Sequence, residues 1–199
     1  MAQGTDRAWA VLAGLAPEDV CQRAVASFDS SGGTYTLKCF GQDVVICPGR
    51  KELRGESAVA VQLLKKLGYF SELALLSYLA GAQDAPLSGQ LVGPSDMKAS
   101  QFFTRGSHVL PMNRVAGKYG SDPEAFLRRG AELSAVPVKL GDAAVQLLPF
   151  PRIPVTILLW RSDEEFPARA DLLFDSSCEQ HLPQDLLWST AMISALIML

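Results

Sequence analysis

The sequence predicts an α+β fold with strands from both ends of the chain and helices from its middle. Strand-like runs occupy residues 34–47 and again 143–174, whereas apolar residues at helical spacing fill residues 57–82. Because strands and helices are segregated along the chain, we expect an antiparallel sheet in which an N-terminal hairpin is added to a C-terminal meander. The helices from the middle of the chain are expected to pack on one side of it.

Size and composition predict one domain. The chain has 199 residues, of which 48% are hydrophobic and 20% are charged, so it holds enough apolar material for a substantial core. It contains no internal repeat, low-complexity tract or linker that would mark a second domain. We therefore expect a single α+β domain over residues 1–199.

The N-terminal elements follow from local signals. Residues 5–27 show a helical pattern, and Pro17 marks the first turn of a second helix. Residues 34–40 alternate like a strand. A short turn leads from them into a second strand over residues 44–47, which ends at Pro48.

The middle of the chain is predicted to be helical. Gly68 divides the pattern over residues 57–82 into two helices, and residues 86–106 have the composition of a loop. Two further helices are expected at about residues 110–118 and 122–134. Asp122, Pro123 and Glu124 provide an N-cap, a proline in the first turn and an acidic first turn for the second of these.

The last third of the chain changes to strands. Residues 143–148, 155–160 and 168–174 are strand candidates, and the segments between them have the length of hairpin connections. The chain contains no dinucleotide-binding glycine motif, no P-loop and no nucleophile elbow. With the segregation of elements, this argues against a doubly wound parallel fold.

The apolar C-terminal helix, from about Gln184, is expected to be buried or to form an interface. The run from Leu186 to Leu199 is interrupted by hydroxyl residues and is shorter than the ~20 residues that span a bilayer. Its apolar residues lie on more than one face, so they need cover from the core or from a second chain. We expect either a core helix or a self-complementary homodimer contact, and favour the core.

Charge is modest overall but uneven. The net charge is −3 and the pI is about 5.4, which argues against a nucleic-acid-binding protein. Residues 98–139 hold seven basic against three acidic residues, and residues 163–185 hold seven acidic residues and one base, Arg169. We expect the two segments either to attract one another in the fold or to be ordinary solvated surfaces.

The cysteines and the N-terminus predict a cytoplasmic protein with free thiols. The chain opens without a basic start and apolar run, so no signal peptide is expected. Its four cysteines, Cys21, Cys39, Cys47 and Cys178, contain no Cys-x-x-Cys pair. A zinc or iron–sulfur site formed by this chain alone is therefore not expected, and the thiols are expected to stay reduced.

The first candidate site is the loop over residues 102–111. His108 follows Phe103 and Arg105, and a neutral imidazole is a common axial ligand for the iron or cobalt of a tetrapyrrole. The alternative is a structural histidine that bonds a backbone carbonyl. Ser107 and His108 with a distant acid also leave open a Ser-His-Asp arrangement, which spacing alone does not indicate.

The second candidate is Arg152, which stands between Pro151 and Pro154. The prolines restrict the backbone, so the guanidinium is held in few directions, as suits a carboxylate or phosphate. The alternative is an internal ion pair. Since the acidic residues 163–167 follow one strand later, we expect Arg152 to pair with one of them or with Asp142.

The third candidate is the acidic run Asp163, Glu164 and Glu165, which is expected to form a turn. Three adjacent acids repel one another unless they are solvated, paired with a base or bound to a hard cation. Beyond it, Asp175 ends a strand and is a natural helix N-cap. His181 has no catalytic partner near it in sequence.

The same segments resemble a known family over nearly the whole chain. The matching residues, in chain order, are 77–79, 86–89, 102–108, 141–142, 151–154, Trp160, 163–167, 173–175 and 182–185. They are similar to an uncharacterised domain-of-unknown-function family found mainly in anaerobic bacteria and archaea. Some relatives carry a cysteine-rich iron–sulfur domain and occur in corrinoid contexts. This chain lacks that cysteine cluster, and the resemblance supplies no catalytic residues.

The residues and the resemblance together lead to three functional hypotheses. The first is a binding or accessory protein of anaerobic metabolism that holds a corrinoid or haem. In it His108 is the metal ligand, Arg105 or Arg152 contacts the carboxylates, and an iron–sulfur or corrinoid protein is the partner. The second is an enzyme that uses Arg152 and the acidic turn on a small anionic or cation-dependent substrate. The third is a structural interaction module.

Overall fold

The strands of the protein form two antiparallel sheets. The structure is a computed structural model that describes residues 2–97 and 109–199, and it confirms the α+β class. The first sheet has the order β1-β2-β3-β4: β1 (Ser27–Asp29), β2 (Thr34–Cys39), β3 (Gln42–Cys47) and β4 (Glu52–Arg54). The second has the order β5-β9-β8-β7-β6: β5 (Leu91–Val92), β6 (Val136–Pro137), β7 (Ala143–Phe150), β8 (Ile153–Trp160) and β9 (Arg169–Asp175).

The N-terminal hairpin and the C-terminal meander are both present, but they do not form one continuous sheet. They meet where the backbone N–H of Phe40 donates to the carbonyl of Leu148 at 2.8 Å. Strand β2 has already ended at Cys39, and Phe40 has a left-handed φ of 50°. The register of β7 also shifts between Leu147 and Phe150. Both segments of the chain turn away at this point, so no ladder of hydrogen bonds continues from one sheet to the other.

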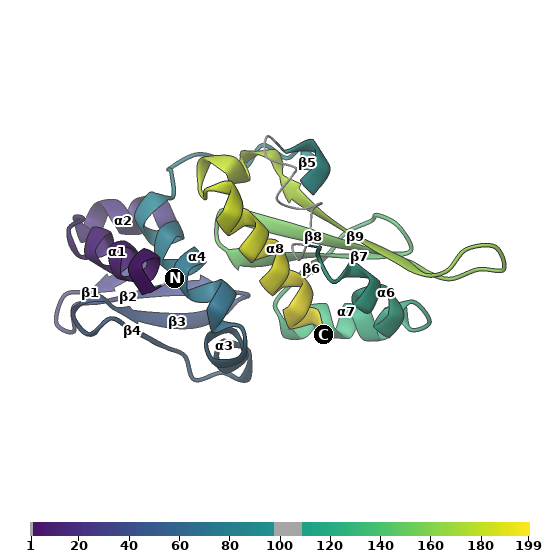
Figure 1. The fold of residues 1–199 in the computed structure, drawn as a ribbon, viewed down its shortest axis with the longest axis horizontal. Coiled ribbons are helices and arrows are strands. Elements are labelled where there is room, and N and C mark those ends of the chain that lie inside the picture. Colours follow the sequence, from purple (N-terminus) through teal and green to yellow (C-terminus); the bar gives the residue numbers. More distant parts are fainter. Residues whose placement is uncertain (1, 98–108) are drawn as a thin grey trace.

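The helices come mainly from the middle of the chain and from its two ends (Figure 1). They are α1 (Ala2–Ala13), α2 (Pro17–Ala24), α3 (Ala58–Val61), α4 (Gly68–Gly81), α6 (Met112–Tyr119), α7 (Pro123–Glu132) and α8 (Gln184–Met198), with a π-helical segment η2 (Gln62–Lys66). Short 3-10 segments are η1 (Pro48–Arg50), η3 (Pro94–Asp96) and η5 (Ser176–Gln180). Helix α4 contacts α1, α2 and α8, and therefore connects the two halves of the molecule.

Local capping explains where several helices begin. The Asp122 carboxylate accepts from the Ala125 N–H at 2.8 Å, with Pro123 at the first helical position, as the sequence predicts. The hydroxyl of Ser57 accepts from the Ala60 N–H at 3.1 Å at the start of α3. Later in α7, a Cβ added at Gly130 would lie 2.8 Å from a methyl of Val145. Only glycine allows α7 to lie this close to β7.

One face of the second sheet is covered by helices. Its inward residues include Val155, Ile157 and Leu159 of β8, which are completely buried. Helices α6, α7 and α8 pack against this sheet, and α8 lies in front of it in Figure 1. The apolar faces of α8 are covered within the chain, so the core position expected for this helix is confirmed. A homodimer contact is not needed to cover them.

Two basic residues of the 98–139 segment, Lys118 and Arg129, bind the end of α8 and not the acidic segment 163–185. Lys118 donates to the carbonyl of Leu199 at 2.6 Å, and Arg129 donates to that of Ile197 at the same distance. Cations suit the C-terminal carbonyls of a helix because of its dipole. Among the described residues, no ion pair joins a base of 98–139 to an acid of 163–185. Within the same residues, no helix is both long and apolar enough to cross a membrane.

Candidate functional site

Arg152 lies in the connection between β7 and β8, where its side chain binds two other parts of the chain. Its Nε donates to the carbonyl of Arg23 at 2.7 Å and its Nη1 to that of Ala85 at 2.8 Å. Its Nη2 lies 2.5 Å from the carboxylate of Asp84 and also donates to the carbonyl of Gln22 at 3.4 Å. The side chain of Arg152 is only 17% exposed. The guanidinium thus joins the end of α2 to the segment after α4.

Asp175 is the acceptor at the centre of a second network, nearby in the fold. Its carboxylate accepts from the N–H and hydroxyl groups of Ser88 and of Ser177, and from the N–H of Gly89, at 2.6–3.0 Å. Burial raises the pKa of Asp175, but the hydrogen bonds from Ser177 and Ser88 outweigh this and lower it to about 2. Asp175 is the N-cap of η5, as predicted, and also fixes the start of the 88–92 segment.

Tyr78 and His181 complete this region from α4 and from the end of η5. The Tyr78 hydroxyl accepts from the Arg152 N–H and donates to the carbonyl of Ala24, both at 3.1 Å. The Nδ1 of His181 accepts from the Gln83 N–H at 3.3 Å, and its Nε2 is buried without a partner. Burial lowers the pKa of His181, and the charge of Arg152 adds to this effect.

These residues form an internal clamp, which we define as Tyr78, Asp84, Arg152, Asp175 and His181. The clamp holds α2, α4, the 82–90 connection, the β7–β8 turn and η5 together. Most of the polar groups that the sequence marks out in these segments are satisfied by backbone groups of the chain itself, as buried polar groups generally are. The arrangement is one that stabilises the fold, with little donor capacity left for a ligand.

The clamp gives an expected pH dependence that His181 controls. Because its pKa is lowered in the folded protein, the unfolded chain binds the proton first as the pH falls below about 6.5. Stability should therefore decrease from pH 7 to pH 5, by up to about 1.4 kcal/mol per pH unit. Asn at position 181 keeps an acceptor for the Gln83 N–H and should flatten this slope. Urea unfolding across this pH range measures it.

His108→Gln is the matched control for that prediction. It removes the other imidazole of the chain and leaves His181 in place. The prediction requires the pH slope to persist in this variant and to shrink in His181→Asn. The reverse result would mean that His181 is protonated equally well in the folded and unfolded chains.

Arg152 does not pair with the acidic turn, and the prediction that it would is wrong. The two lie at opposite ends of β8, which has eight residues and is therefore roughly 25 Å long. Successive turns of a meander lie at opposite ends of its strands. Arg152 and the acidic turn are therefore far apart although only one strand separates them in sequence. Asp142, the other predicted partner, instead accepts from the Arg161 N–H at 2.7 Å. Arg152 and the acidic turn consequently do not form one catalytic site.

The acidic turn belongs to a separate cavity at the tip of the β8–β9 hairpin, which we call the tip cavity. Its volume is about 640 Å³. It is lined by residues of the 142, 160–163 and 166–169 segments: Asp142, Trp160, Arg161, Asp163, Phe166, Pro167, Ala168 and Arg169. The guanidinium carbon of Arg169 lies 4.1 Å from the centre of the Trp160 ring. Among the described residues there is no group of three potential metal ligands at this tip or elsewhere.

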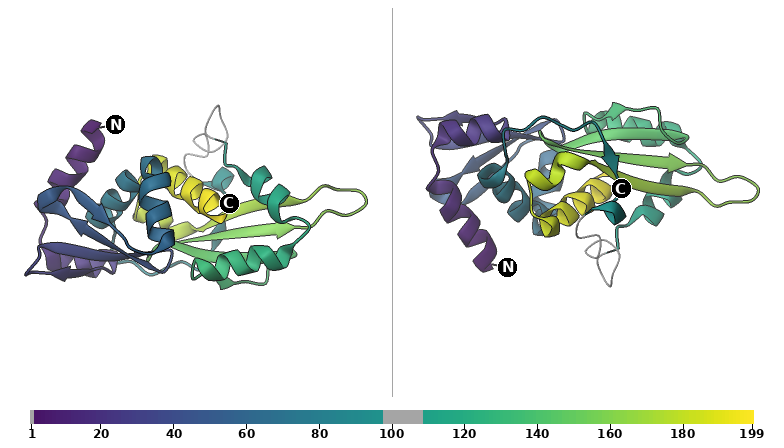
Figure 2. Two further views of the ribbon diagram at one scale, coloured as in Figure 1. Left: turned by 90° about the horizontal axis from the view of Figure 1, so that it is seen from below. Right: turned by 90° about the horizontal axis from the view of Figure 1, so that it is seen from above.

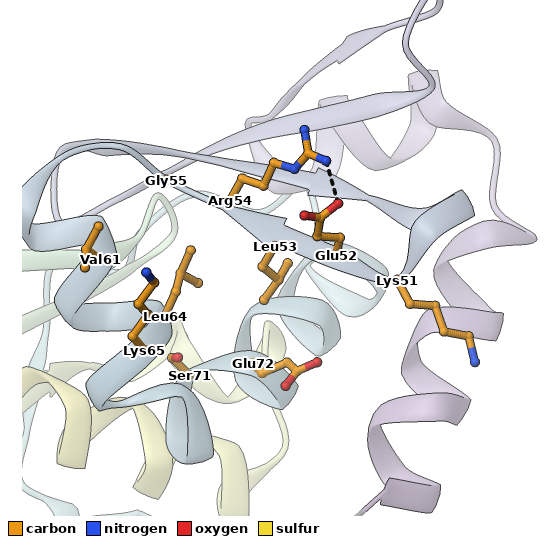
Figure 3. Close-up of a pocket in the computed structure, with 10 residues that line it drawn as sticks. All are labelled: Lys51, Glu52, Leu53, Arg54, Gly55, Val61, Leu64, Lys65, Ser71 and Glu72. Atoms are coloured by element: carbon orange, nitrogen blue, oxygen red, sulfur yellow. Dashed lines mark hydrogen bonds and ion pairs between the residues drawn. The ribbon is translucent and has the colours of Figure 1, made fainter.

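A second opening lies beside β4, the edge strand of the first sheet (Figure 3). This groove has a volume of about 450 Å³ and runs between β4 and the helical segment 61–72. Leu53 and Leu64 form its apolar floor, and Lys65 and Glu72 stand at its sides. Across the strand, Arg54 and Glu52 pair at 2.7 Å. Charges of both signs line this groove, so it favours neither an anionic nor a cationic ligand.

Three predicted site residues, Phe103, Arg105 and His108, lie outside the described residues. The segment that contains them begins after Met97, which is 6% exposed, and ends before Val109, which is 63% exposed. Met97 and Leu110 both pack against the main apolar cluster. The described residues that flank the segment, Met97 and Leu110, therefore lie at the core.

Sequence reasoning missed the contributions of Tyr78, Asp84 and Ser88. Tyr78 looks like an ordinary apolar position of an amphipathic helix, and its hydroxyl partners are distant in sequence. Asp84 and Ser88 stand in a segment with the composition of a loop. The available signal was two segments with restricted backbones: the prolines around Arg152 and the Pro-Leu-Ser-Gly run at 86–89. This pattern predicts two well-ordered connections, but it does not predict that the two connections lie close to each other.

The fold and the clamp define an α+β protein whose unusual polar residues mainly connect its own segments. The comparison with family models confirms an uncharacterised family. The chain belongs to the family described as domain of unknown function DUF3786, whose model matches residues 16–196. No curated protein matches the chain, and no solved structure does.

Proposed function

We propose that this chain is a cytoplasmic binding or accessory protein of anaerobic metabolism that holds a tetrapyrrole, either a corrinoid or haem, with His108 as the axial ligand. Such a group would supply metal-centred chemistry, and the chain would hold and orient it. The cytoplasmic location is supported by three buried thiols, those of Cys39, Cys47 and Cys178, which stay unpaired.

The observation that carries this proposal is the internal use of the other candidate residues. His181 is 2% exposed, accepts one backbone hydrogen bond and adjoins no cavity described above. It therefore does not fit the role of a ligand, which leaves His108 as the available imidazole. Arg152 does not fit the role of a carboxylate contact because its donors are already bonded. Arg105 remains for that role, and Phe103 for packing on the ring.

The proposal predicts a visible-region spectral change. Haemin or cob(III)alamin added to the purified chain at tens of micromolar should shift its absorption bands, which requires a Kd in the micromolar range. His108→Ala should abolish the shift, because it removes the axial nitrogen. His181→Asn is the matched control and should retain it. An unchanged spectrum with both compounds would remove the tetrapyrrole from the proposal.

A second candidate function, an interaction module, is favoured by the tip of the β8–β9 hairpin. Phe166 is 66% exposed there, next to the acidic turn. In this reading the chain docks on a partner, such as an iron–sulfur or corrinoid protein, or on its own copy. Size-exclusion chromatography with light scattering measures the self-association, and co-purification of candidate partners measures the other case.

A further inference from the structure

The loop between β8 and β9 extends away from the helices in all three views (Figures 1 and 2). The last paired residues are Trp160 and Arg169, so residues 161–168 form the tip. Phe166 lies in this tip and is 66% exposed. Among the described residues, no aromatic or cation–π contact includes its ring. The tip therefore presents a large apolar ring that the fold itself does not use.

Hydrogen bonds within the tip fix the backbone that carries the Phe166 ring. The Asp163 N–H donates to the carbonyl of Phe166 at 3.0 Å. One carboxylate oxygen of Asp163 accepts from the N–H groups of Phe166 and Glu165, at 2.7 and 2.9 Å. These bonds, from Phe166 and then Glu165, lower the pKa of Asp163, so its negative charge is kept. An ordered tip loses less entropy on binding than a loose one.

The tip cavity beneath Phe166 already holds one cation against an aromatic ring. Arg169 stacks on Trp160 at 4.1 Å and lies 3.5 Å from the carboxylate of Asp171. A second guanidinium or ammonium would meet the same kinds of group at the exposed ring and the nearby acids. The cavity is polar as well as aromatic, because half of its lining residues carry charged side chains.

The charges around the cavity are predominantly negative. Four acids, Asp142, Asp163, Glu164 and Glu165, stand at positions 142 and 161–169 against two bases, Arg161 and Arg169. Arg169 is engaged by Trp160 and Asp171, so its charge is largely compensated. A partner with positive charge is thus attracted to the tip, whereas an acidic partner is repelled.

We propose that the tip of the β8–β9 hairpin binds a partner protein through basic side chains, with a Lys or Arg of the partner entering the tip cavity beside Phe166. The exposed ring supplies apolar and cation–π contact, and the acids around it select the sign of the charge. This inference goes beyond the tetrapyrrole proposal and does not depend on it, because the residues that carry it are distinct.

The test uses the full chain and a fluorescein-labelled peptide of alternating Arg and Leu, with a Glu and Leu peptide of the same length for comparison. Fluorescence anisotropy should show saturable binding of the basic peptide and none of the acidic one. Phe166→Ser should weaken the binding at least about tenfold. Glu164→Gln with Glu165→Gln should weaken it and make it less sensitive to salt.

Two matched controls separate this site from general charge attraction. Tyr69→Ser removes a ring of α4 that is 68% exposed, and Glu56→Gln removes an exposed acid beside the first sheet. Both should bind the basic peptide like the unaltered chain. Equal binding by all variants, equal loss in the controls, or no binding of the basic peptide would overturn the proposal. Self-association that is lost in Phe166→Ser, without peptide binding, would assign the tip to a second copy instead.

Discussion

Replacing Arg152 by Met is expected to lower the free energy of unfolding by about 3 kcal/mol. Met has a similar length but no donors, so the carbonyls of Arg23 and Ala85 lose their 2.7 and 2.8 Å hydrogen bonds. These carbonyls belong to the end of α2 and to the segment after α4, which the side chains of Gln22 and Arg23 also connect. A fully buried acceptor without a partner costs about 1–3 kcal/mol. Both of these bonds are part-buried, and the loss of the two together gives the expected value. Urea unfolding at pH 7 measures the loss.

Two further variants define what this result means. Arg152→Lys keeps the positive charge but cannot form the planar fork of bonds, so we expect roughly half the loss. Arg128→Met removes an exposed arginine whose ion pair with Asp122 is long, at 3.6 Å, and should change stability little. If Arg152→Met unfolds like the unaltered chain, the clamp does not stabilise the fold, and Arg152 regains its place as a ligand-binding candidate.

The longer elements of the fold could be predicted from the sequence because each contains several repeats of its pattern. The strands β2, β3, β7, β8 and β9 and the helices α4, α6, α7 and α8 lie close to their predicted positions. The strands β5 and β6 have two residues each, and β1 and β4 have three. Such short strands show no alternation, since their hydrogen bonds to a neighbour alone define them.

The candidate site was predicted less well because it depends on which turns lie at the same end of the sheet. Arg152 was recognised as a fixed guanidinium, but its partner Asp84 is 68 residues away in sequence. The acidic turn was placed beside it because only one strand separates them. A meander sends these two turns to opposite ends, and only the register of β7, β8 and β9 shows this. Residue type thus predicted the chemistry of each group but not its partners.

The long apolar run at the C-terminus correctly predicted a buried helix, and removing its end is the second change with a large expected effect on stability. Deleting residues 195–199 is expected to destabilise the chain by at least about 5 kcal/mol, which approaches the whole stability of a typical domain. The deletion removes Ala195, Ile197 and Met198, which are completely buried. It also removes carbonyls that Lys118, Tyr119 and Arg129 bind. The melting temperature should fall by more than about 10 °C, or the chain should fail to fold.

Point variants keep this prediction testable if the truncated chain does not fold. Ile197→Ala should cost about 3 kcal/mol, because it leaves a cavity among completely buried side chains. Leu196→Ala is the matched control: this side chain is only partly buried and should cost clearly less. Thermal melting with light scattering measures stability and association together. If Ile197→Ala melts like the unaltered chain, or if both variants dissociate a dimer without a change in monomer stability, α8 serves as an interface and not as part of the core.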